Sequence, residues 1–424
     1  MTRPIDSISL VGLGRLGLPM AACFAASGVP TVGIDADADK IAALTSGETP
    51  IAEPGLEALL AAARPHLNFT VDVGRAGDTD ATIFFLPTPV GSEDRGYSST
   101  IVLQAVEAVA RSVADRGTGD HVFILSSTIM PGTMTSIIEP AIRRILNGKP
   151  FGLAYVPEFA ALGNLIAGYR KPDVLLVGRS SPLIGERVAD LYRRIHTVPV
   201  PVESVGLTDA EIAKVALNNF ICMKIGFANF LGEYCRKRGD ADVDAITRVL
   251  GHDRRIGPRY LTAGMPYGGP CFGRDNGAFI AMTGAVELPA DQISATEVAN
   301  ERQKKTIAET VIDAGARSVA LLGVAFKPDT PTAETSPTVE IARVLLARGL
   351  PVHLFDFLPE TRRQTSIDGA VWHETFESAV AAAEAVIVAH PDKRFAPVAG
   401  LLRPDQTLVD YWRIMPNTSA DDRT

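Results

Sequence analysis

The sequence predicts an α/β protein with an N-terminal Rossmann-like, doubly wound sheet, a central helical region with one long helix, and a smaller C-terminal Rossmann-like α/β domain. The first third alternates short apolar stretches with helical patterns, and the last third returns to the same alternation. Such alternation is typical of a parallel sheet with helices on its faces. The middle instead holds a long proline-free stretch with helical apolar spacing.

Three domains are expected, at residues 1–200, 201–312 and 313–424. A chain of 424 residues is long enough for about two to four domains of ordinary size. The strands expected in the first domain are short and apolar, at residues 8–14, 30–35, 81–86, 121–127, 152–156 and 174–178. The elements expected in the last domain are strands at 318–326, 351–356, 385–390 and 407–411 and helices at 338–349 and 376–383.

One helix is expected over residues 208–238, which is long for a globular domain. Thr208, followed three residues later by Glu211, predicts a capping box at its start. The stretch is too apolar for an exposed rod, so we expect it to be buried between domains or against a second subunit. Further helices are expected at 241–251 and 289–312.

The composition is that of a soluble protein, with 46% hydrophobic and 21% charged residues. The net charge of −8 is spread along the chain, which argues against nucleic acid or an anionic membrane as the main partner but allows a small anionic ligand. No uncharged apolar run approaches the roughly 20 residues of a membrane helix, and residues 7–13 run into a glycine loop without a cleavage-like site. We therefore expect a cytoplasmic protein.

The segment GLGRLG fits the G-x-G-x-x-G pattern, with Gly12, Gly14 and Gly17 as its glycines. It follows an expected strand and opens an expected helix, so its backbone and the helix N-terminus can approach a pyrophosphate. Asp35 ends the next expected strand, where a carboxylate accepts hydrogen bonds from a ribose diol and repels a 2′-phosphate. The alternative is a glycine turn with a surface aspartate, but the combination favours NAD over NADP.

The four cysteines show no C-x-x-C spacing, which predicts neither a zinc site nor disulfides and suits a reducing compartment. Cys23, Cys222 and Cys235 lie in helical patterns and are expected to be packed apolar residues. Cys271 lies in GGPCFGRD, where glycines allow close backbone approach and nearby N–H groups or cations can lower the pKa of a thiol. A packed, inert cysteine is the alternative at this position.

Polar side chains of the long helix and of two strand ends are further candidates. Lys214 and Asn218 are spaced i, i+4, so both project from one helix face. Lys214 reaches either a polar site or the surface, and both interpretations stay open. Thr128 and Glu158 each follow an expected strand, and doubly wound sheets bind ligands at the carboxyl ends of their strands. A carboxylate placed there is a candidate general base.

These residues together resemble the UDP-glucose/GDP-mannose dehydrogenase family over nearly the whole chain. The ordered motifs that carry the resemblance are GLGRLGLP (12–19), EPGL (53–56), PTP (87–89), STIMPGT (127–133), PEF (157–159), AKVALNN (213–219), RRIG (254–257), YGGPCFGRD (267–275) and GVAFKPDT (323–330). The resemblance implies an NAD-dependent, four-electron oxidation of the C6 alcohol of a nucleotide sugar to the carboxylate.

The resemblance also implies a role for each candidate residue. Cys271 would attack the aldehyde to give a thiohemiacetal, a second oxidation would make a thioester, and water would release the acid. Lys214 and Asn218 would stabilise the developing oxyanion. In the last step Asp275 would order a water or share a proton, Glu158 would act as the base, and Thr128 would hold the water.

Binding residues are implied in the same way. The contacts expected for NAD are those of Gly12, Gly14, Arg15, Leu16, Gly17, Asp35, Lys40, Thr88 and Thr128. The contacts expected for the nucleotide sugar are those of Glu158, Phe159, Lys214, Asn218, Arg255, Tyr260, Gly268 and Lys327. Arg255 would enter the site of the partner subunit, so we expect a homodimer or a higher even homo-oligomer. The last domain lacks a G-x-G-x-x-G loop and would hold UDP, the nucleotide half of the substrate, rather than NAD.

Three positions depart from the family pattern. Leu162 stands where the family often has a second glutamate, so thioester hydrolysis would rest more heavily on Glu158. Glu334 stands where an arginine is frequent, and an acid beside a phosphate site is unfavourable. The segment VDYWRIM fits the family pattern only loosely, so Arg413 is assigned no role.

UDP-glucose is the first substrate that these motifs suggest, with GDP-mannose or a UDP-N-acetylhexosamine as alternatives. A two-electron β-hydroxyacid or sugar-acid dehydrogenase is a second hypothesis, and such an enzyme needs no thiol. A non-catalytic regulator that binds NAD or a sugar nucleotide is a third, motivated by Leu162 and Glu334.

Overall fold

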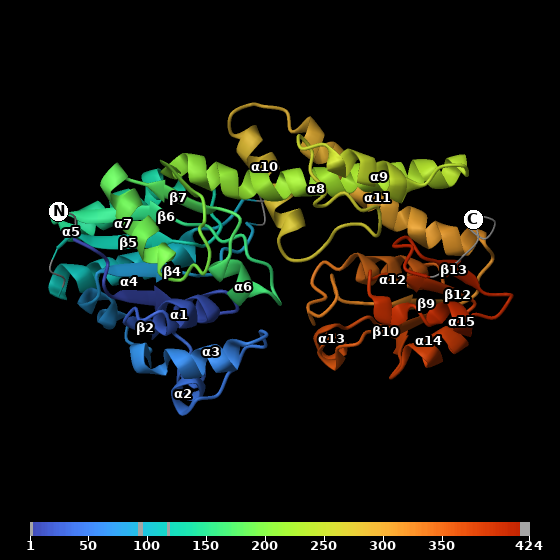
Figure 1. Cartoon of the computed structure of the whole chain (residues 1–424), viewed down its shortest axis with the longest axis horizontal. Helices are drawn as coiled ribbons and strands as arrows, with labels where there is room; N and C mark the ends of the chain where they lie inside the picture. The colour runs from blue at the N-terminus through green and yellow to red at the C-terminus, as the bar shows by residue number, and fades with distance from the viewer. Residues whose placement is uncertain (1–2, 92–95, 117–118, 416–424) are drawn as a thin grey trace. The chain divides into compact units, whose positions relative to one another are not determined.

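The structure is a computed structural model, and it describes residues 3–91, 96–116 and 119–415. The chain divides into two compact units, Met1–Ala216 and Leu217–Thr424 (Figure 1). Each unit contains one sheet with helices on both of its faces. The expected fold class is therefore confirmed, while the division into three domains stays a prediction.

The sheet of the first unit has eight strands. They are β1 (Ile8–Val11), β2 (Thr31–Ile34), β3 (Leu67–Thr70), β4 (Ala81–Phe84), β5 (His121–Leu125), β6 (Phe151–Tyr155), β7 (Leu175–Arg179) and β8 (Val202–Gly206). Their order is β3-β2-β1-β4-β5-β6-β7-β8, and all neighbours are parallel except β6 and β7. The strand order reverses at β1, which is where doubly wound sheets bind their ligands.

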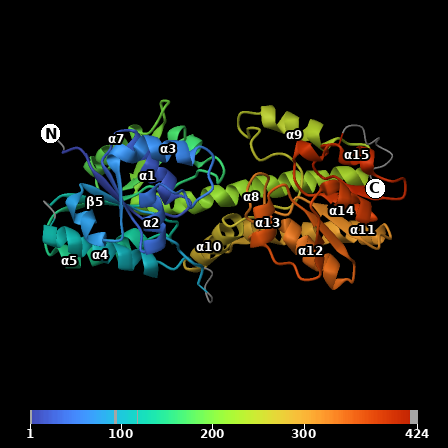
Figure 2. The same cartoon turned by 90° about the horizontal axis from the view of Figure 1, so that it is seen from below.

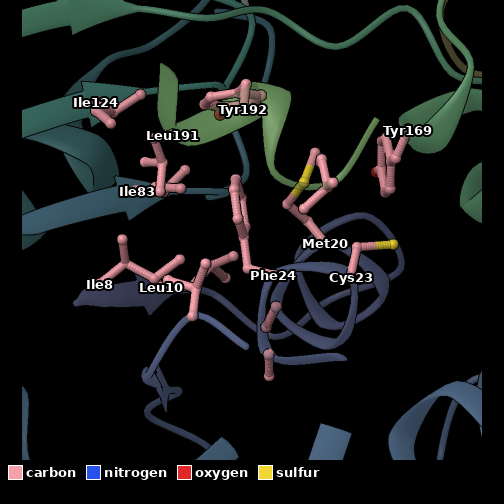
Figure 3. Packing of buried hydrophobic residues seen from close by; sticks show 14 of the residues in the cluster. Ile8, Leu10, Met20, Cys23, Phe24, Ile83, Ile124, Tyr169, Leu191 and Tyr192 are labelled. Carbon is pink, nitrogen blue, oxygen red and sulfur yellow. The ribbon is translucent and has the colours of Figure 1, made fainter. Parts of the chain in front are cut away.

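Two apolar layers hold helices on this sheet. The helices on one face are α1 (Gly17–Ala26), α2 (Ala38–Ser46), α3 (Leu56–Ala63), α6 (Leu165–Arg170) and α7 (Pro182–Arg193). Those on the other are α4 (Thr100–Arg116), α5 (Glu139–Leu146) and the start of α8 (Leu207–Arg238). Figure 3 shows the first layer, where Phe24 of α1 meets Tyr192 of α7 edge to face with ring centroids 5.3 Å apart.

The sheet of the second unit has five parallel strands. They are β9 (Val319–Leu322), β10 (Val352–Phe355), β11 (Ala370–Trp372), β12 (Ala385–Val388) and β13 (Thr407–Val409), in the order β11-β10-β9-β12-β13. One face packs against α11 (Asp291–Asp313) and α12 (Pro337–Ala347), and the other against α14 (Phe376–Ala382) and α15 (Val398–Leu401) (Figure 2). The described part of this unit also contains α9 (Val243–His252), α10 (Phe272–Gly284), α13 (Pro359–Gln364) and most of α8.

The long helix α8 begins and ends within one residue of the expected bounds, and it contributes to both units. The expected capping box is not formed. The carboxylate of Glu211 instead accepts the N–H groups of Gly132 (2.6 Å) and Met134 (2.8 Å), in the loop that follows β5. Asp209 holds the start of the helix by accepting the N–H of Gly206 at 3.1 Å. The capping-box prediction was wrong because Glu211 finds a partner distant in sequence.

The helix α8 is only partly buried. Phe220, Phe227, Phe230 and Tyr234 are 60%, 51%, 55% and 54% exposed. Among the residues that the structure describes, α8 is the one helix long and apolar enough, by length and composition, to cross a membrane. A single such helix is a weak sign, because core helices of soluble proteins meet the same criterion.

Candidate active site

The loop after β1 has the geometry of a dinucleotide cradle. Gly12 has a φ of 97°, and a Cβ there would lie 2.1 Å from the carbonyl oxygen of Phe85. A Cβ at Gly17 would lie 1.9 Å from the carbonyl oxygen of Gly12, whereas one at Gly14 would meet nothing within 4 Å. No side chain caps the N-terminus of α1, so its first N–H groups can bind a pyrophosphate.

Asp35 is fixed at the end of β2 by three donors. One oxygen, Oδ2, accepts the N–H of Leu13 and the Nζ of Lys40, both at 2.8 Å, and Oδ1 accepts the N–H of Asp37 at 3.0 Å. Burial raises the pKa of Asp35, but the hydrogen bonds and the charge of Lys40 outweigh it and hold that pKa below its usual value. The ionised carboxylate keeps lone pairs for a ribose diol, so these residues fit NAD.

The other residues expected to contact NAD vary in exposure. Arg15 and Leu16 are exposed in the loop before α1, Thr88 is buried after β4, and Thr128 is half-buried after β5. Lys40 is half-buried and forms an ion pair with Asp35. Its charge therefore acts on the carboxylate that fits a ribose diol.

Lys214 is buried rather than extended to the surface. Its Nζ donates to the backbone oxygen of Glu158 at 2.9 Å and lies 5.0 Å from the centre of the Phe159 ring. The surface interpretation of Lys214 is therefore wrong. The lysine fixes the PEF segment that follows β6, and it brings three of the expected substrate-binding residues together in the first unit.

Glu158 lies in surroundings that favour its protonated form. Burial raises the pKa of this carboxyl to about 8, and the charge of Lys214 lowers it only in part. Burial also raises the pKa of Cys23 to about 11, with a small further contribution from Glu158, so that thiol is inert. Glu158 must lose its proton before it can act as a base, and its activity should rise with pH.

Glu53, in the EPGL motif, is a structural residue of this site to which no role was assigned. Its carboxylate accepts the N–H groups of Gly163 (2.9 Å), in the loop after the PEF segment, and of Leu165 (2.7 Å), the first residue of α6. The hydroxyl of Tyr169 donates to the backbone oxygen of Leu16 at 3.1 Å, which ties α6 to the dinucleotide loop. The only signal in the sequence was the motif itself.

Cys271 is the exposed thiol of the chain, and the other three cysteines are buried. It occupies the N-cap of α10, and its backbone oxygen accepts the N–H of Asp275 at 2.9 Å. The buried Asp275 accepts a hydrogen bond from Asn218 Nδ2 at 2.5 Å. The interpretation of Cys271 as a packed residue is therefore wrong. Its sulfur is therefore accessible to a reactant at the start of α10.

The glycine loop before this thiol packs tightly on the segment after β9. A Cβ at Gly268 would lie 2.4 Å from the backbone oxygen of Thr335, and one at Gly269 would lie 2.5 Å from the Phe326 ring. The N–H of Gly269 donates to the backbone oxygen of Thr335 at 3.2 Å. The Thr335 hydroxyl donates to the backbone oxygen of Gly269 at 2.7 Å. The segment that carries Lys327 is thereby fixed to the loop of the thiol.

Two expected substrate-binding residues, Arg255 and Tyr260, lie at the surface, as does Glu334, which departs from the family pattern. Arg255 is 88% exposed and forms a bidentate ion pair with Asp253, with a shortest contact of 2.6 Å. Tyr260 is 50% exposed with a φ of 62°. Glu334 is exposed, and Leu162 packs against the apolar core of the first unit. Within the described ranges, no group of three or more His, Cys, Asp and Glu residues is placed to hold a metal ion.

One unit has a glycine loop and an aspartate that fit a dinucleotide, and the other exposes a thiol at the start of a helix. An NAD-dependent dehydrogenase can use both features. Three models of the UDP-glucose/GDP-mannose dehydrogenase family match the chain: the NAD binding domain at residues 6–196, the central domain at 208–302 and the UDP binding domain at 320–417. The chain belongs to this family.

Individual relatives match almost end to end. A UDP-glucose 6-dehydrogenase of Haloferax volcanii is 32% identical over 402 residues, which are 92% of each chain. A GDP-mannose 6-dehydrogenase of Azotobacter vinelandii is 28% identical over 97% of this chain and 98% of its own. A solved UDP-glucose dehydrogenase of Pyrobaculum islandicum is 30% identical, with a TM-score of 0.89 over 99% of this chain and 96% of its own.

The family defines the class of reaction. The protein is an oxidoreductase that uses NAD, and its substrates are nucleotide sugars that are oxidised at C6. These conclusions confirm the expected enzyme class, cofactor and kind of substrate.

Proposed function

We propose that the protein oxidises the C6 alcohol of UDP-glucose to the carboxylate of UDP-glucuronate, with two NAD reduced for each sugar. The observation that carries this proposal is the exposed Cys271 at the start of α10, one turn before an aspartate that Asn218 holds. The relatives with 32% and 30% identity, both described as UDP-glucose dehydrogenases, support UDP as the nucleotide and glucose as the sugar. The 28% identical enzyme makes GDP-mannose the first alternative, and a UDP-N-acetylhexosamine is the second.

NAD, when bound by the first unit, supplies the acceptor for the hydride in both oxidations. The Cys271 thiolate adds to the C6 aldehyde to form a thiohemiacetal, while Lys214 and Asn218 stabilise the oxyanion. Oxidation of the thiohemiacetal at C6 leaves a thioester on the sulfur. Water then attacks the thioester carbon, the C–S bond breaks, and the carboxylate and the free thiol are released.

Hydrolysis of the thioester needs a base and an oriented water. We assign the base to Glu158, which takes a proton from the attacking water, and the orientation of that water to Thr128. Asp275 exchanges a proton with the sulfur or orders a second water. Because Leu162 supplies no second carboxylate, hydrolysis of the thioester rests more heavily on Glu158.

Binding of the substrate is proposed to follow the three-part division of the chain. The domain at 1–200 holds NAD, the domain at 201–312 carries the thiol and the subunit contact, and the domain at 313–424 holds UDP. Lys327 contacts the sugar nucleotide from the last domain, with Tyr260 and Gly268 from the loops before the thiol. A cytoplasmic enzyme suits this use of NAD and nucleotide sugars.

The oligomer is proposed to be a homodimer, or a higher even assembly, that covers the exposed face of α8. Phe220, Phe227, Phe230 and Tyr234 recur at intervals of seven, three and four residues, so they lie along one side of the helix. Large exposed apolar faces mark interaction sites. Light scattering should give a dimeric or larger mass, and Phe227→Glu should give monomers with lost activity. A wild-type monomer with full activity would refute the assembly and the role of Arg255 in the partner's site.

The proposal is tested by counting the NADH formed for each acid from UDP-glucose, GDP-mannose and UDP-N-acetylglucosamine. Two NADH with UDP-glucose, and the highest kcat/KM for that sugar, are expected. One NADH with a stable aldehyde or ketone would reject the thioester route and favour a two-electron dehydrogenase. No NADH from any nucleotide sugar would favour a non-catalytic regulator.

A further inference from the structure

A buried polar network joins α10, the helix that begins at the thiol, to α8 and α11. Its members have no role in the proposed reaction. Its members are Asn219 on α8, Asn276 on α10, Glu297 on α11 and Tyr267 in the segment before the glycine loop. Asn219 is 3% exposed and Asn276 is fully buried. A buried amide is costly unless its polar atoms are bonded, so a network of this kind needs a physical reason.

The network runs from α8 through α10 to α11. Asn219 Nδ2 donates to Asn276 Oδ1 at 2.5 Å. Asn276 Nδ2 donates to the Tyr267 hydroxyl at 3.3 Å and to Glu297 Oε1. The Tyr267 hydroxyl donates to the same carboxylate oxygen at 2.6 Å. Burial and this hydrogen bond to Glu297 raise the pKa of Tyr267, so its hydroxyl stays protonated and remains a donor.

The carboxylate of Glu297 sets the direction of every bond in the network. Both Tyr267 and Asn276 donate to its Oε1 atom. The amide of Asn276 therefore turns its nitrogen toward Glu297 and its oxygen toward Asn219. Glu297 thus fixes the orientation of Asn276, the residue that follows Asp275 in the sequence.

The network forms the second of two adjacent links between α8 and α10. Asn218 binds Asp275, and the next residue on each helix repeats the pairing, since Asn219 binds Asn276. We infer that Asn276, held by Glu297 and Tyr267, is a positioning residue that sets the register of α10 against α8. It thereby places the sulfur at the start of α10 and keeps Asp275 within reach of Asn218. The inference rests on the proposed function, because it concerns the thiol of that reaction.

The test replaces Asn276 by leucine, which has a similar size and makes no hydrogen bond. Misplacing a reacting group by about 1 Å can slow a reaction by about 100-fold, so we expect Asn276→Leu to lower kcat by about 10–100-fold. The KM values for UDP-glucose and NAD should stay within about threefold, because the expected binding groups lie elsewhere. The rate at which iodoacetamide alkylates Cys271 should fall. The midpoint of the pH dependence of this rate should shift to higher pH.

Asn229→Leu is the matched control. Asn229 lies on α8, the helix of Asn219, and is 7% exposed. Its amide nitrogen donates to the backbone oxygen of Met265 and to Gln303, and its amide oxygen accepts the N–H of Gly264. This variant should lower Tm about as much as Asn276→Leu while kcat and the alkylation rate stay within about threefold. An equal loss of kcat in both variants, or an unchanged kcat in Asn276→Leu, would overturn the inference.

Two further variants keep the test decisive. Glu297→Gln keeps an acceptor oxygen but can also donate, so its kcat and alkylation rate should fall between those of the wild type and Asn276→Leu. If Asn276→Leu does not fold, Glu297→Gln alone decides, and a wild-type alkylation profile in that variant refutes the inference. Cys271→Ala separates the two claims. An active Cys271→Ala refutes the proposed function, whereas an inactive one beside a normal Glu297→Gln refutes only the positioning role.

Discussion

The loops that follow β1 and β9 begin alike and continue differently. Gly12 and Gly323 have φ values of 97° and 95°. Their N–H groups donate at 2.8 Å to the backbone oxygens of Ile34 and Phe355, the last residues of β2 and β10. The next N–H in each loop binds an aspartate carboxylate at 2.8 Å, Asp35 in the first unit and Asp356 in the second. The same turn therefore stands at the same place in two sheets of the same core strand order.

The difference lies in how soon a helix follows. After Gly12 the helix α1 starts at Gly17, so its N-terminus faces the open space at Gly14. After Gly323 the helix α12 starts only at Pro337, and the long segment between them packs on the glycine loop of the thiol. A Cβ at Gly323 would also lie 2.5 Å from the His390 ring. The loop after β1 has the geometry to bind a dinucleotide. The loop after β9 instead places the segment of Lys327 against the loop of the thiol.

The largest expected difference between the two loops comes from placing a larger side chain in the loop after β1. Gly14→Val should raise the KM for NAD by at least about 100-fold, because its side chain enters the space of the pyrophosphate. Its Tm should stay unchanged, since a Cβ there meets no protein atom within 4 Å. Gly323→Ala should do the opposite, with a fall in Tm and an unchanged KM for NAD. A rise in the KM for NAD in Gly323→Ala would contradict the assignment of the two loops.

The two aspartates give the next largest contrast. Asp35→Asn should raise the KM for NAD by about 10–100-fold, because a neutral amide makes weaker hydrogen bonds to the ribose than the charged carboxylate it replaces. Asp356→Asn should leave that KM unchanged and lower thermal stability, since its carboxylate accepts the backbone N–H groups of Val324, Ala325 and Leu358. Steady-state kinetics and a melting curve of each variant distinguish the outcomes. Equal effects of both substitutions on NAD would show that the two sites are not distinct in function.

The first sheet continues past β5, and the carboxylate that follows β6 has no counterpart in the second. Because the pKa of Glu158 is about 8 and the base must be ionised, kcat limited by thioester hydrolysis should rise about fivefold from pH 7 to pH 8. The profile should level off above about pH 9. Glu158→Gln should be slow at every pH. A wild-type kcat that is flat or falls over this range would exclude Glu158 as the base.

The smallest expected effect concerns the cation beside Asp35. Lys40→Ala should raise the KM for NAD by about two- to fivefold, because a partly exposed ion pair is worth little. High salt should reduce the difference between this variant and the wild type. An effect as large as that of Asp35→Asn would instead show that Lys40 is a principal ligand of NAD.

Much of the fold follows from local patterns. Strands such as β1, β4 and β5 are buried apolar runs bounded by turns, and α8 carries helical spacing over its whole length. The strands β3 and β11 lie at the edges of their sheets and lack the fully buried apolar run of β1 or β4. The helix α10 is obscured because GGP precedes it and Gly273, Gly277 and Gly284 lower its helix propensity.

The types of the site residues were predictable, but their partners were not. Cys271, Lys214 and Glu158 stand in motifs whose order and spacing can be recognised along the chain. The bond from Gly163 to Glu53 joins residues 110 positions apart, and no local period relates them. The links of Asn219 and Glu297 to Asn276 likewise depend on how three helices pack. Sequence patterns indicate which side chains react, and tertiary packing decides what holds them.

The covalent role of Cys271 is tested most directly by trapping the thioester in Glu158→Gln. After the variant is mixed with UDP-glucose and NAD, mass spectrometry of its peptides should show the glucuronyl group of the sugar nucleotide on Cys271. Unmodified Cys271 in that variant, together with release of the acid or of an aldehyde at the wild-type rate, would contradict the account.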